Sequence, residues 1–292
     1  MHKSLLVIGK TSQLGQTLQN LVNQSTTHTP QQTFTFTGRQ ELDLADPNSI
    51  SRFFNQQRFD AIINCAAYTA VDQAENEPEH ANQINHLAVK QLAEIAKKQH
   101  TTLIQLSTDY VFDGTKRTPY KETDPTRPIN VYGLTKSLGE QACLRINPKG
   151  AIIRTSWLYS HHGHNFIKTM LRLSQQRDQL KIVNDQFGSP TNAVDLAQAI
   201  INLINNPQTQ TALKIYHYAN EGVCTWYDLA QHLFKLTETR CQLIPIKSQD
   251  YPTQAKRPAY SALNTQRIQT QLNHPTRNWQ QALKTHLATT PS

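Results

Sequence analysis

Short apolar segments alternate with longer helical segments through the first half of the chain, and this alternation limits the fold most strongly. The apolar segments span residues 4–8, 33–37, 61–65, 102–107 and 151–155, and the helical segments span residues 15–24, 47–56, 78–99 and 131–146. Strands that are apolar along their whole length are buried on both faces, as in parallel sheets covered by helices. The alternation therefore predicts an α/β fold with a doubly wound parallel sheet of the Rossmann type.

The pattern changes after about Trp157. Helical segments at residues 165–176, 192–205 and 226–237 mix there with isolated strands and proline-rich turns such as IPIKSQDYP. We expect residues 1–156 to form a dinucleotide-binding domain. Residues 157–292 are expected to form mainly a smaller substrate-binding region, partly interleaved with the first because no linker-like stretch separates them.

Composition excludes several other classes of protein. The chain has 292 residues, of which 37% are hydrophobic and 17% charged, which is typical of a globular protein. No apolar run reaches the ~18 residues of a membrane span, and the apolar start is too short for a signal peptide. The four cysteines are scattered without a CxxC pair. This argues against zinc ribbons and disulfide frameworks and favours a reducing, cytoplasmic location.

The formal net charge of +8 has two interpretations. It is either a general excess of Lys and Arg on the surface or the counterpart of an anionic ligand. Nucleic acid is disfavoured as that ligand, because the chain has no cluster of basic residues and no aromatic-basic motif.

A glycine-spaced loop follows the first apolar segment, in the stretch VIGKTSQLG. A strand that turns into a helix through such a loop is typical of a phosphate site at the helix N-terminus. Ser12 stands between Gly9 and Gly15, where a middle glycine would let the backbone approach a pyrophosphate closely. The sequence therefore predicts a nucleotide loop and leaves open how Ser12 alters it.

Tyr132 and Lys136 lie four residues apart on a predicted helix and so point from the same face. A neighbouring ammonium lowers the pKa of a phenol and makes it a usable general acid. Thr108 lies where a buried strand ends, at the sheet edge where open α/β sheets bind ligands. A surface Tyr–Lys pair is the alternative for YxxxK alone, but the occurrence of the three features in this order argues against that alternative.

Seven segments together resemble the extended short-chain dehydrogenase/reductases. They are GKTSQLG, NCAAYTAVDQAENEP, STDYVFDGTKRTPYKETDPTRPINVYGLTKSLGE, IIRTSWLY, NFIKTMLRL, VNDQFGSPT and KRPAYSAL. The first six run from about Leu5 to Ile201 in matching order and spacing. Within that family they are most similar to reductases of dTDP-4-dehydro sugars in rhamnose biosynthesis.

The resemblance implies a role for each matching residue. Tyr132 would donate a proton, Lys136 would hold the nicotinamide ribose, and Thr108 would hydrogen-bond the substrate carbonyl. Asp109, Trp157 and Arg257 would contact the sugar nucleotide, with Lys168 a second candidate for its diphosphate. The residues implied around the cofactor are Gly9, Ser12, Gln13, Leu14 and Gly15 at the pyrophosphate, Asp43 and Leu44 near the adenine, and Ala66, Ala67 and Tyr68 in the central cleft.

Simpler roles remain open for some of these residues. Trp157 fits an apolar core equally well, and the small residues of CAAY fit close packing. Arg257 and Lys168 fit solvated surface charges.

The implied reaction is reduction of the C4 ketone of dTDP-4-dehydro-L-rhamnose by NADPH or NADH to give dTDP-L-rhamnose, for cell-surface polysaccharide. The alternatives are a reductase of another dTDP-deoxysugar, such as a streptose-type sugar, and a non-catalytic NADP-binding regulatory subunit like the partner of methionine adenosyltransferase.

Two departures from the family pattern bear on partners and cofactor choice. Thr17 stands where some relatives have a glutamate connected with magnesium at a dimer contact, so no metal site is predicted and a homodimer is left open. The second strand ends in TGR, without the acidic residue that would hold a free ribose 2′-hydroxyl. Arg39 is instead placed to meet a 2′-phosphate, which predicts a modest preference for NADPH.

Overall fold

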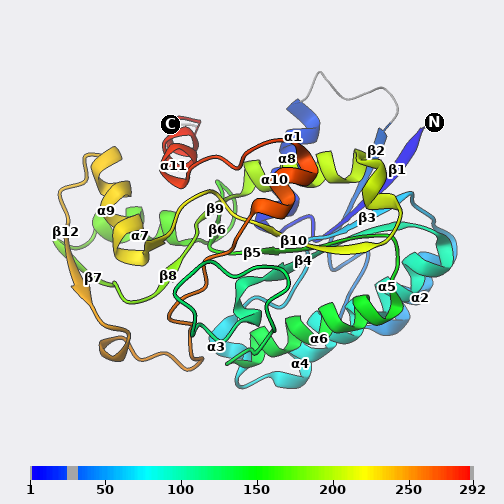
Figure 1. Cartoon of the computed structure of the whole chain (residues 1–292), viewed down its shortest axis with the longest axis horizontal. Helices are drawn as coiled ribbons and strands as arrows, with labels where there is room; N and C mark the ends of the chain where they lie inside the picture. The colour runs from blue at the N-terminus through cyan, green and yellow to red at the C-terminus, as the bar shows by residue number, and fades with distance from the viewer. Residues whose placement is uncertain (1, 25–31, 290–292) are drawn as a thin grey trace.

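The computed structural model describes residues 2–24 and 32–289, and its centre is one parallel sheet of six strands. The strand order is β10-β5-β4-β3-β1-β2 (Figure 1). The strands are β1 (Lys3–Ile8), β2 (Gln32–Thr37), β3 (Ala61–Asn64), β4 (Thr102–Thr108), β5 (Gly150–Thr155) and β10 (Leu213–Tyr218). The doubly wound α/β fold predicted from the sequence is confirmed.

Helices cover both faces of this sheet (Figure 1). Leu5 and Val7 of β1 pack on one face, together with residues of α1 (Gln13–Gln24) and α8 (Ala193–Asn205). The alternate residues Leu6 and Ile8 pack on the other face, against α2 (Pro47–Gln56) and α5 (Ala88–Gln99), with α6 (Val131–Ile146) beside α5. Successive residues of a strand point to opposite faces, so apolar strands produce two cores.

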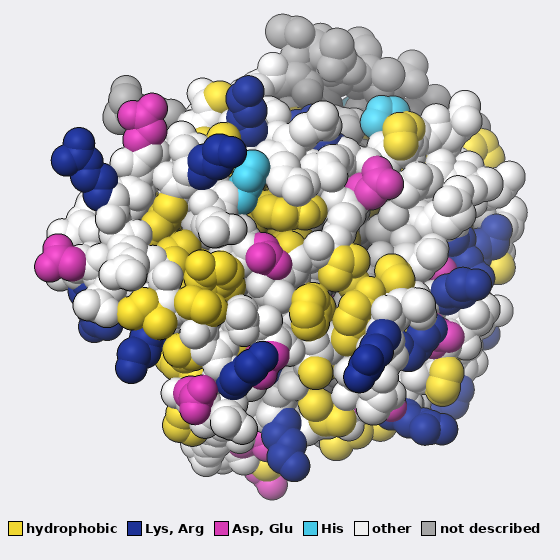
Figure 2. Space-filling view, turned by 60° about the vertical axis from the view of Figure 1, so that its left-hand side comes forward, with side chains coloured by type: hydrophobic (Ala, Val, Ile, Leu, Met, Phe, Trp, Pro, Cys, Tyr) yellow, Lys and Arg dark blue, Asp and Glu magenta, His cyan; other side chains and the backbone are white. Residues whose placement is uncertain are grey.

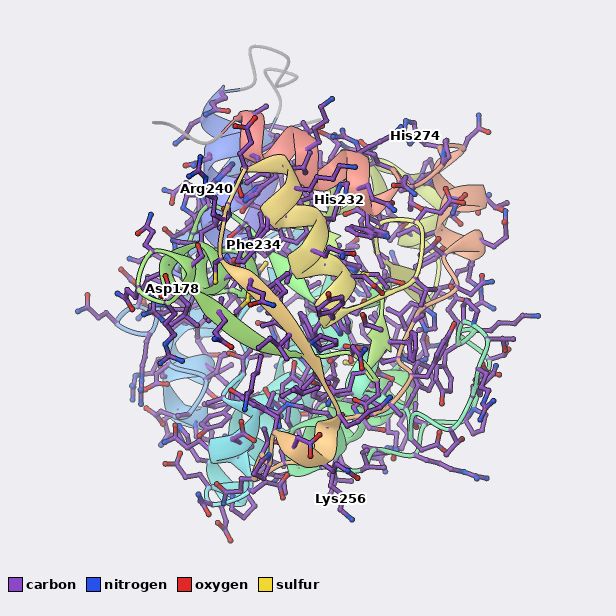
Figure 3. The ribbon with its side chains drawn as sticks, turned by 90° about the vertical axis from the view of Figure 1, so that its left-hand side faces the viewer. Asp178, His232, Phe234, Arg240, Lys256 and His274 are labelled. Carbon is purple, nitrogen blue, oxygen red and sulfur yellow. The ribbon has the colours of Figure 1, made fainter. Side chains whose placement is uncertain are left out.

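The second region has its own apolar cluster (Figure 3). The helix α9 (Trp226–Leu236) packs across the parallel pair β7 (Gln179–Val183) and β12 (Gln242–Ile246), with Phe234 buried between them. Helices α7 (Phe166–Ser174) and α11 (Trp279–Ala288) add apolar side chains to the same cluster. Its remaining strands are β6 (Leu158–Tyr159), β8 (Phe187–Gly188), β9 (Thr191–Asn192) and β11 (Cys224–Thr225).

The sheet does not end where the first region was expected to end. Its edge strand β10 and the helix α8 both come from beyond residue 156, and β10 pairs with β5 over six residues. Residue 156 is therefore not a boundary of the sheet. The β10 segment LKIYHY mixes polar and apolar residues, and a short strand of this kind carries a weak sequence signal.

The predicted helix at residues 78–99 is divided into three segments. It consists of α4 (Pro78–Asn82), a π-helical turn η1 (Gln83–Leu87) and α5. The remaining helices are α3 (Val71–Ala74) and α10 (Gln266–Leu272), with 3₁₀ turns η2 (Asp109–Val111), η3 (Pro207–Gln210) and η4 (Ser248–Asp250). A π-helical turn inserts one extra residue, which hydropathy periodicity does not reveal.

The molecular surface bears on the interpretation of the net charge. On the face drawn in Figure 2, Lys and Arg side chains are dispersed around the periphery and interleaved with Asp and Glu. This distribution favours a general surface excess of basic residues. Within residues 2–24 and 32–289, no helix has both the length and the apolar character to span a membrane.

Candidate active site

A cavity of about 700 Å³ lies along the carboxyl ends of β1 to β5. Most of the residues predicted for the site line it: Gly9, Ser12, Gln13, Leu14, Arg39, Asp43, Leu44, Ala66, Ala67, Thr108, Asp109, Tyr132, Lys136 and Trp157. Gly15, Tyr68, Lys168 and Arg257 do not line it. Parallel strands bring their carboxyl ends to one edge, which is why residues distant in sequence meet there.

Ser12 is the N-cap of α1. Its side-chain oxygen accepts a hydrogen bond from the amide of Gly15 at 3.0 Å. Among the described residues, five non-glycine residues have positive φ, and Ser12 is not one of them. A serine here therefore costs no backbone strain, and it satisfies one of the free amides of the first helical turn. The loop keeps its geometry without the middle glycine.

The two glycines of the loop are required by close approach. Gly9 has φ of +91°, and a Cβ on it would lie 2.9 Å from the amide nitrogen of Ala66. A Cβ on Gly15 would lie 2.1 Å from the carbonyl oxygen of Gly9. Gly15 thus lets α1 begin directly against β1, which aims the amides and dipole of α1 into the cavity. This cradle fits a dinucleotide pyrophosphate, and Gly15 serves it by packing.

Residues from the second region hold the phosphate loop from outside. The Gln13 side-chain oxygen accepts hydrogen bonds from Ser160 Oγ and Asn165 Nδ2, both at 3.0 Å. His164 lies in the same segment and lines the cavity. The segment 160–165 therefore couples the loop after β6 to the start of α1.

The positions of Tyr132 and Lys136 follow from how α6 begins. Asn130 caps the helix by accepting from the amide of Gly133 at 2.7 Å. A Cβ on Gly133 would lie 2.1 Å from the carbonyl oxygen of Tyr110, so glycine allows α6 to start against η2. This contact brings Tyr132 to the cavity beside Thr108, while Lys136 Nζ donates to the carbonyl oxygen of Leu106 at 2.6 Å.

The expected lowering of the tyrosine pKa is wrong for this structure. Burial raises the pKa of Tyr132 to about 12. The hydrogen bond with the Thr108 hydroxyl lowers that pKa, but by less than burial raises it. Burial lowers the pKa of Lys136 to about 8, with Glu140 acting in the opposite direction. The enclosure of both groups outweighs the ammonium–phenol attraction assumed from their spacing. Tyr132 is consequently protonated at neutral pH, which is the form a proton donor needs.

Asp109 is a buried carboxyl group in the same cavity. It follows β4 directly, is 2% exposed, and accepts a hydrogen bond from Thr108 Oγ1 at 3.2 Å. Burial raises its pKa to about 7. Near neutral pH the group is therefore partly protonated and can either donate to or accept from a polar ligand.

Trp157 lines the cavity and packs against the second region at the same time. Its ring stacks on Trp226 with centroids 3.5 Å apart and planes 9° from parallel. Its φ of 48° is in the left-handed region, where non-glycine residues are uncommon. The indole also covers Gly188, where a Cβ would come within 2.4 Å of the ring. Trp157 therefore packs in an apolar cluster, as one sequence interpretation expected. It also lies at the cavity wall, where the other interpretation, a ligand contact, remains a prediction.

Three predicted ligand contacts have other partners. Arg257 forms a bidentate ion pair with Asp72, in which Nη1 lies 3.0 Å from Oδ1 and Nη2 lies 2.6 Å from Oδ2. The Tyr68 hydroxyl donates to Glu77 at 2.8 Å, away from the cavity. Lys168 Nζ donates to the carbonyl oxygen of His161 at 3.1 Å.

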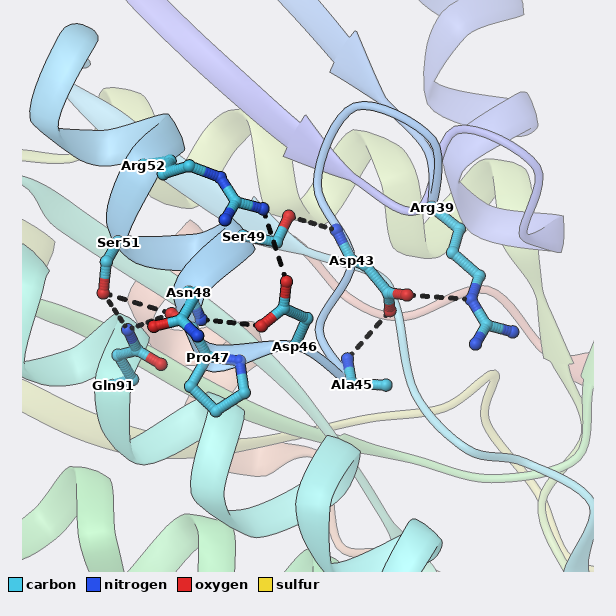
Figure 4. A network of polar contacts seen from close by, with 10 residues as sticks. All are labelled: Arg39, Asp43, Ala45, Asp46, Pro47, Asn48, Ser49, Ser51, Arg52 and Gln91. Atoms are coloured by element: carbon cyan, nitrogen blue, oxygen red, sulfur yellow. Dashed lines mark hydrogen bonds and ion pairs between the residues drawn. The ribbon is translucent and has the colours of Figure 1, made fainter.

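The opposite end of the cavity carries four charged groups. Arg39 Nε donates to Asp43 at 3.1 Å, and the Arg39 side chain is 75% exposed (Figure 4). Glu41 accepts from the amide of Gly38 at 2.8 Å and from Lys10 Nζ at 2.5 Å. An acidic residue therefore does reach the end of β2, three residues after Gly38, and Lys10 neutralises it.

Several cavity residues were not anticipated from the sequence. They include Thr11, Cys65, Thr69, Ser107, Ser156, His164 and Leu196. Ser107 ends a predicted strand and Ser156 directly follows one, so their position at the sheet edge could have suggested them. Leu196 and His164 come from beyond residue 156, and no local pattern connects them to the cavity.

Comparison with known proteins decides the family. The chain matches the model of the RmlD substrate binding domain over residues 2–291. It is 41% identical over 252 residues to a dTDP-4-dehydrorhamnose reductase of Aggregatibacter actinomycetemcomitans, covering 84% of this chain and 86% of the relative. The chain belongs to the dTDP-4-dehydrorhamnose reductase family.

Two further members or neighbours of this family are informative. A dTDP-4-keto-6-deoxy-D-glucose reductase of Streptomyces niveus is 40% identical over 247 residues, covering 84% of each chain. The crystal structure of a dTDP-4-dehydrorhamnose reductase from Bacillus anthracis, in complex with NADP, superposes with a TM-score of 0.92 at 32% identity. That superposition covers 99% of each chain. The resemblance seen in the sequence is confirmed.

The capping role of Ser12 can be tested directly. Ser12→Ala should lower the free energy of unfolding by about 1 kcal/mol, and Ser12→Gly by a few tenths, because an N-cap hydroxyl is lost. Denaturant unfolding of the free protein measures both. In NADPH titrations Ser12→Gly should change Kd by less than about tenfold, or ~1.4 kcal/mol, and Ser12→Ala should bind most weakly. Equal stability of wild type and Ser12→Ala would contradict the cap.

Proposed function

We propose that the chain transfers hydride from NADPH to C4 of dTDP-4-dehydro-L-rhamnose and produces dTDP-L-rhamnose. The observation that carries this proposal is that Thr108, Tyr132 and Lys136 line the same cavity as the phosphate loop. Family membership supports the substrate class. The nicotinamide, when bound, supplies the hydride, and the protein orients it and handles the proton.

The polar groups at the end of β4 and the start of α6 would act on the ketone oxygen. Negative charge develops on that oxygen during reduction and is stabilised best by hydrogen-bond donors already in place. Tyr132 is one such donor and would complete the step by transferring its phenolic proton. Thr108 would be the second, with its hydroxyl turned from Asp109 to the ketone. Lys136, one helical turn further, would bind the nicotinamide ribose through its ammonium.

Two other functions remain alternatives. The Streptomyces niveus relative acts on a different dTDP-keto sugar, so identification of the sugar product is needed to separate the two substrates. A non-catalytic NADP-binding subunit would have no need of Thr108, Tyr132 and Lys136 together. Turnover decides between an enzyme and such a subunit.

The reaction is tested by following NADPH oxidation with enzymatically prepared dTDP-4-dehydrorhamnose and identifying the sugar formed. Tyr132→Phe keeps the ring and removes the proton, so turnover should fall by ~10²-fold or more. NADPH affinity should barely change. Retention of more than about a third of the activity would show that another group donates the proton.

Cofactor choice is expected to depend on Arg39. The wild type should prefer NADPH modestly, because the guanidinium can pair with a 2′-phosphate while the Asp43 contact through Nε limits the gain. Arg39→Ala should narrow the difference in kcat/KM between NADPH and NADH. Arg52→Ala is the matched control, since Arg52 is 70% exposed and pairs with Asp46 at 3.4 Å but does not line the cavity. Equal kcat/KM for both cofactors in the wild type would refute this assignment.

Trp157 is expected to contribute to binding of the sugar nucleotide. Loss of an aromatic contact worth ~0.5–1.5 kcal/mol should raise KM for the substrate in Trp157→Ala roughly 2- to 10-fold, with little change in NADPH affinity. Thermal unfolding separates this from packing. If Trp157→Ala lowers stability but leaves KM unchanged, the ring serves only the stack with Trp226.

A further inference from the structure

A third titratable residue lies on the same helical face as the proton donor and the lysine. Tyr132, Lys136 and Glu140 are spaced four residues apart along α6, which places them in one row. Glu140 is 3% exposed and Lys136 is 4% exposed. A carboxylate so deeply buried needs strong partners to remain ionised.

Arg154 of β5 supplies that partnership. Its Nε donates to both Glu140 oxygens, at 2.9 Å and 3.2 Å, and its Nη2 donates to Glu140 Oε2 at 2.6 Å. Arg154 itself is 2% exposed. The planar guanidinium thus holds the carboxylate in one orientation between α6 and the sheet.

His217 of β10 contacts Arg154 on the side away from Glu140. Its Nε2 lies 3.2 Å from Arg154 Nη1, and its Nδ1 lies 3.0 Å from the carbonyl oxygen of Tyr120. Burial lowers the pKa of His217 to about 3, so the ring is neutral. A neutral ring with its proton on Nδ1 donates to Tyr120 and accepts from Arg154. The Arg154 side chain is therefore held on the side away from Glu140 as well.

Glu140 also reaches the cavity wall. Its Oε1 accepts from Ser107 Oγ at 2.5 Å, and Ser107 lines the cavity next to Thr108. A carboxylate here is not needed to hold Ser107 alone, since a neutral acceptor would do this without the cost of burying a charge. The charge compensates the buried Arg154 guanidinium, and it also lies one helical turn from Lys136.

We propose that Glu140 is a positioning residue of the reduction: its buried carboxylate, fixed by Arg154 one helical turn from Lys136, keeps Lys136 protonated. This inference rests on the proposed reductase function and deepens it. The Nζ of Lys136 also donates to the carbonyl oxygen of Leu106. That carbonyl is neutral and would accept equally from an uncharged amine. The negative charge of Glu140 is what favours the ammonium.

Other groups near α6 do not replace that charge. They are Tyr132 and Cys143 on α6, Asp109 after β4, Arg154 on β5, Glu75 beside the first turn, and His86 and Arg145 near the opposite face. Burial lowers the pKa of Lys136, and the charges of Glu140 and Cys143 would raise it. Burial raises the pKa of the Cys143 thiol to about 12, so Cys143 is neutral at neutral pH.

The inference is tested by the pH dependence of kcat. Lys136 is active when protonated, so activity is lost as pH rises through its pKa. Glu140→Gln should lower that pKa and move the alkaline limb to lower pH by about one unit or more. Glu140→Asp keeps a carboxylate and should keep the limb close to that of the wild type.

Controls separate this role from stability. Glu140→Gln leaves Arg154 buried without its carboxylate, so the double variant Glu140→Gln/Arg154→Met should melt at a higher temperature than the single variant. Its limb should lie between those of Glu140→Gln and the wild type, because a buried cation is removed together with the anion. Glu122→Gln removes another carboxylate, whose side chain is 5% exposed and accepts from the amide of His217 at 3.2 Å, and this variant should leave the limb in place.

The outcomes are distinct. An unshifted limb in folded Glu140→Gln would overturn the role of Glu140 while the reductase function stands. Absence of turnover in the wild type would overturn the proposed function, and the inference with it. A limb shifted to lower pH in Glu140→Gln, together with unshifted limbs in Glu140→Asp and Glu122→Gln, is the expected result.

Discussion

Burial of both faces of the parallel sheet is the constraint on which the rest of this structure depends. A strand covered on both sides has to pair its backbone fully within the sheet, and its parallel neighbours require crossover connections. Helices supply these connections on both faces and form the two cores around Leu5 and Leu6. As a consequence all six carboxyl ends meet at one edge, and the loops that leave that edge build the cavity.

Close approach of backbones determines the shape of that cavity. Gly15 lets α1 start against Gly9, and Gly133 lets α6 start against Tyr110. Each helix is also capped by a side chain at its first turn, Ser12 for α1 and Asn130 for α6. The phosphate loop and the proton donor are therefore placed by the same device, a capped helix start pressed against the end of a strand.

The electrostatics of the site follow from this enclosure. Lys136 is buried and Tyr132 is half-buried in the cavity wall, so desolvation dominates their pKa values and keeps the tyrosine protonated. Burial of Lys136 also makes a buried counter-charge more effective than it would be in water. The ion pair of Glu140 and Arg154 joins α6 to β5 through the core, and the contact of Arg154 with His217 extends these polar contacts to the edge strand β10.

The sequence by itself determined the elements of the first half, the phosphate loop and the row of Tyr132 and Lys136. These features depend on periodicity and on residues a few positions apart, which local backbone geometry relates directly. The family resemblance added most of the other cavity residues.

Only the tertiary structure decided that the sheet takes its edge strand β10 from beyond residue 156, and that Arg257 pairs with Asp72 across 185 positions. It also decided that Ser12 serves as an N-cap and that Glu140 forms an ion pair with Arg154. Such contacts depend on the path of the whole chain and on how deeply each group is buried, and neither quantity is encoded in any short stretch of residues.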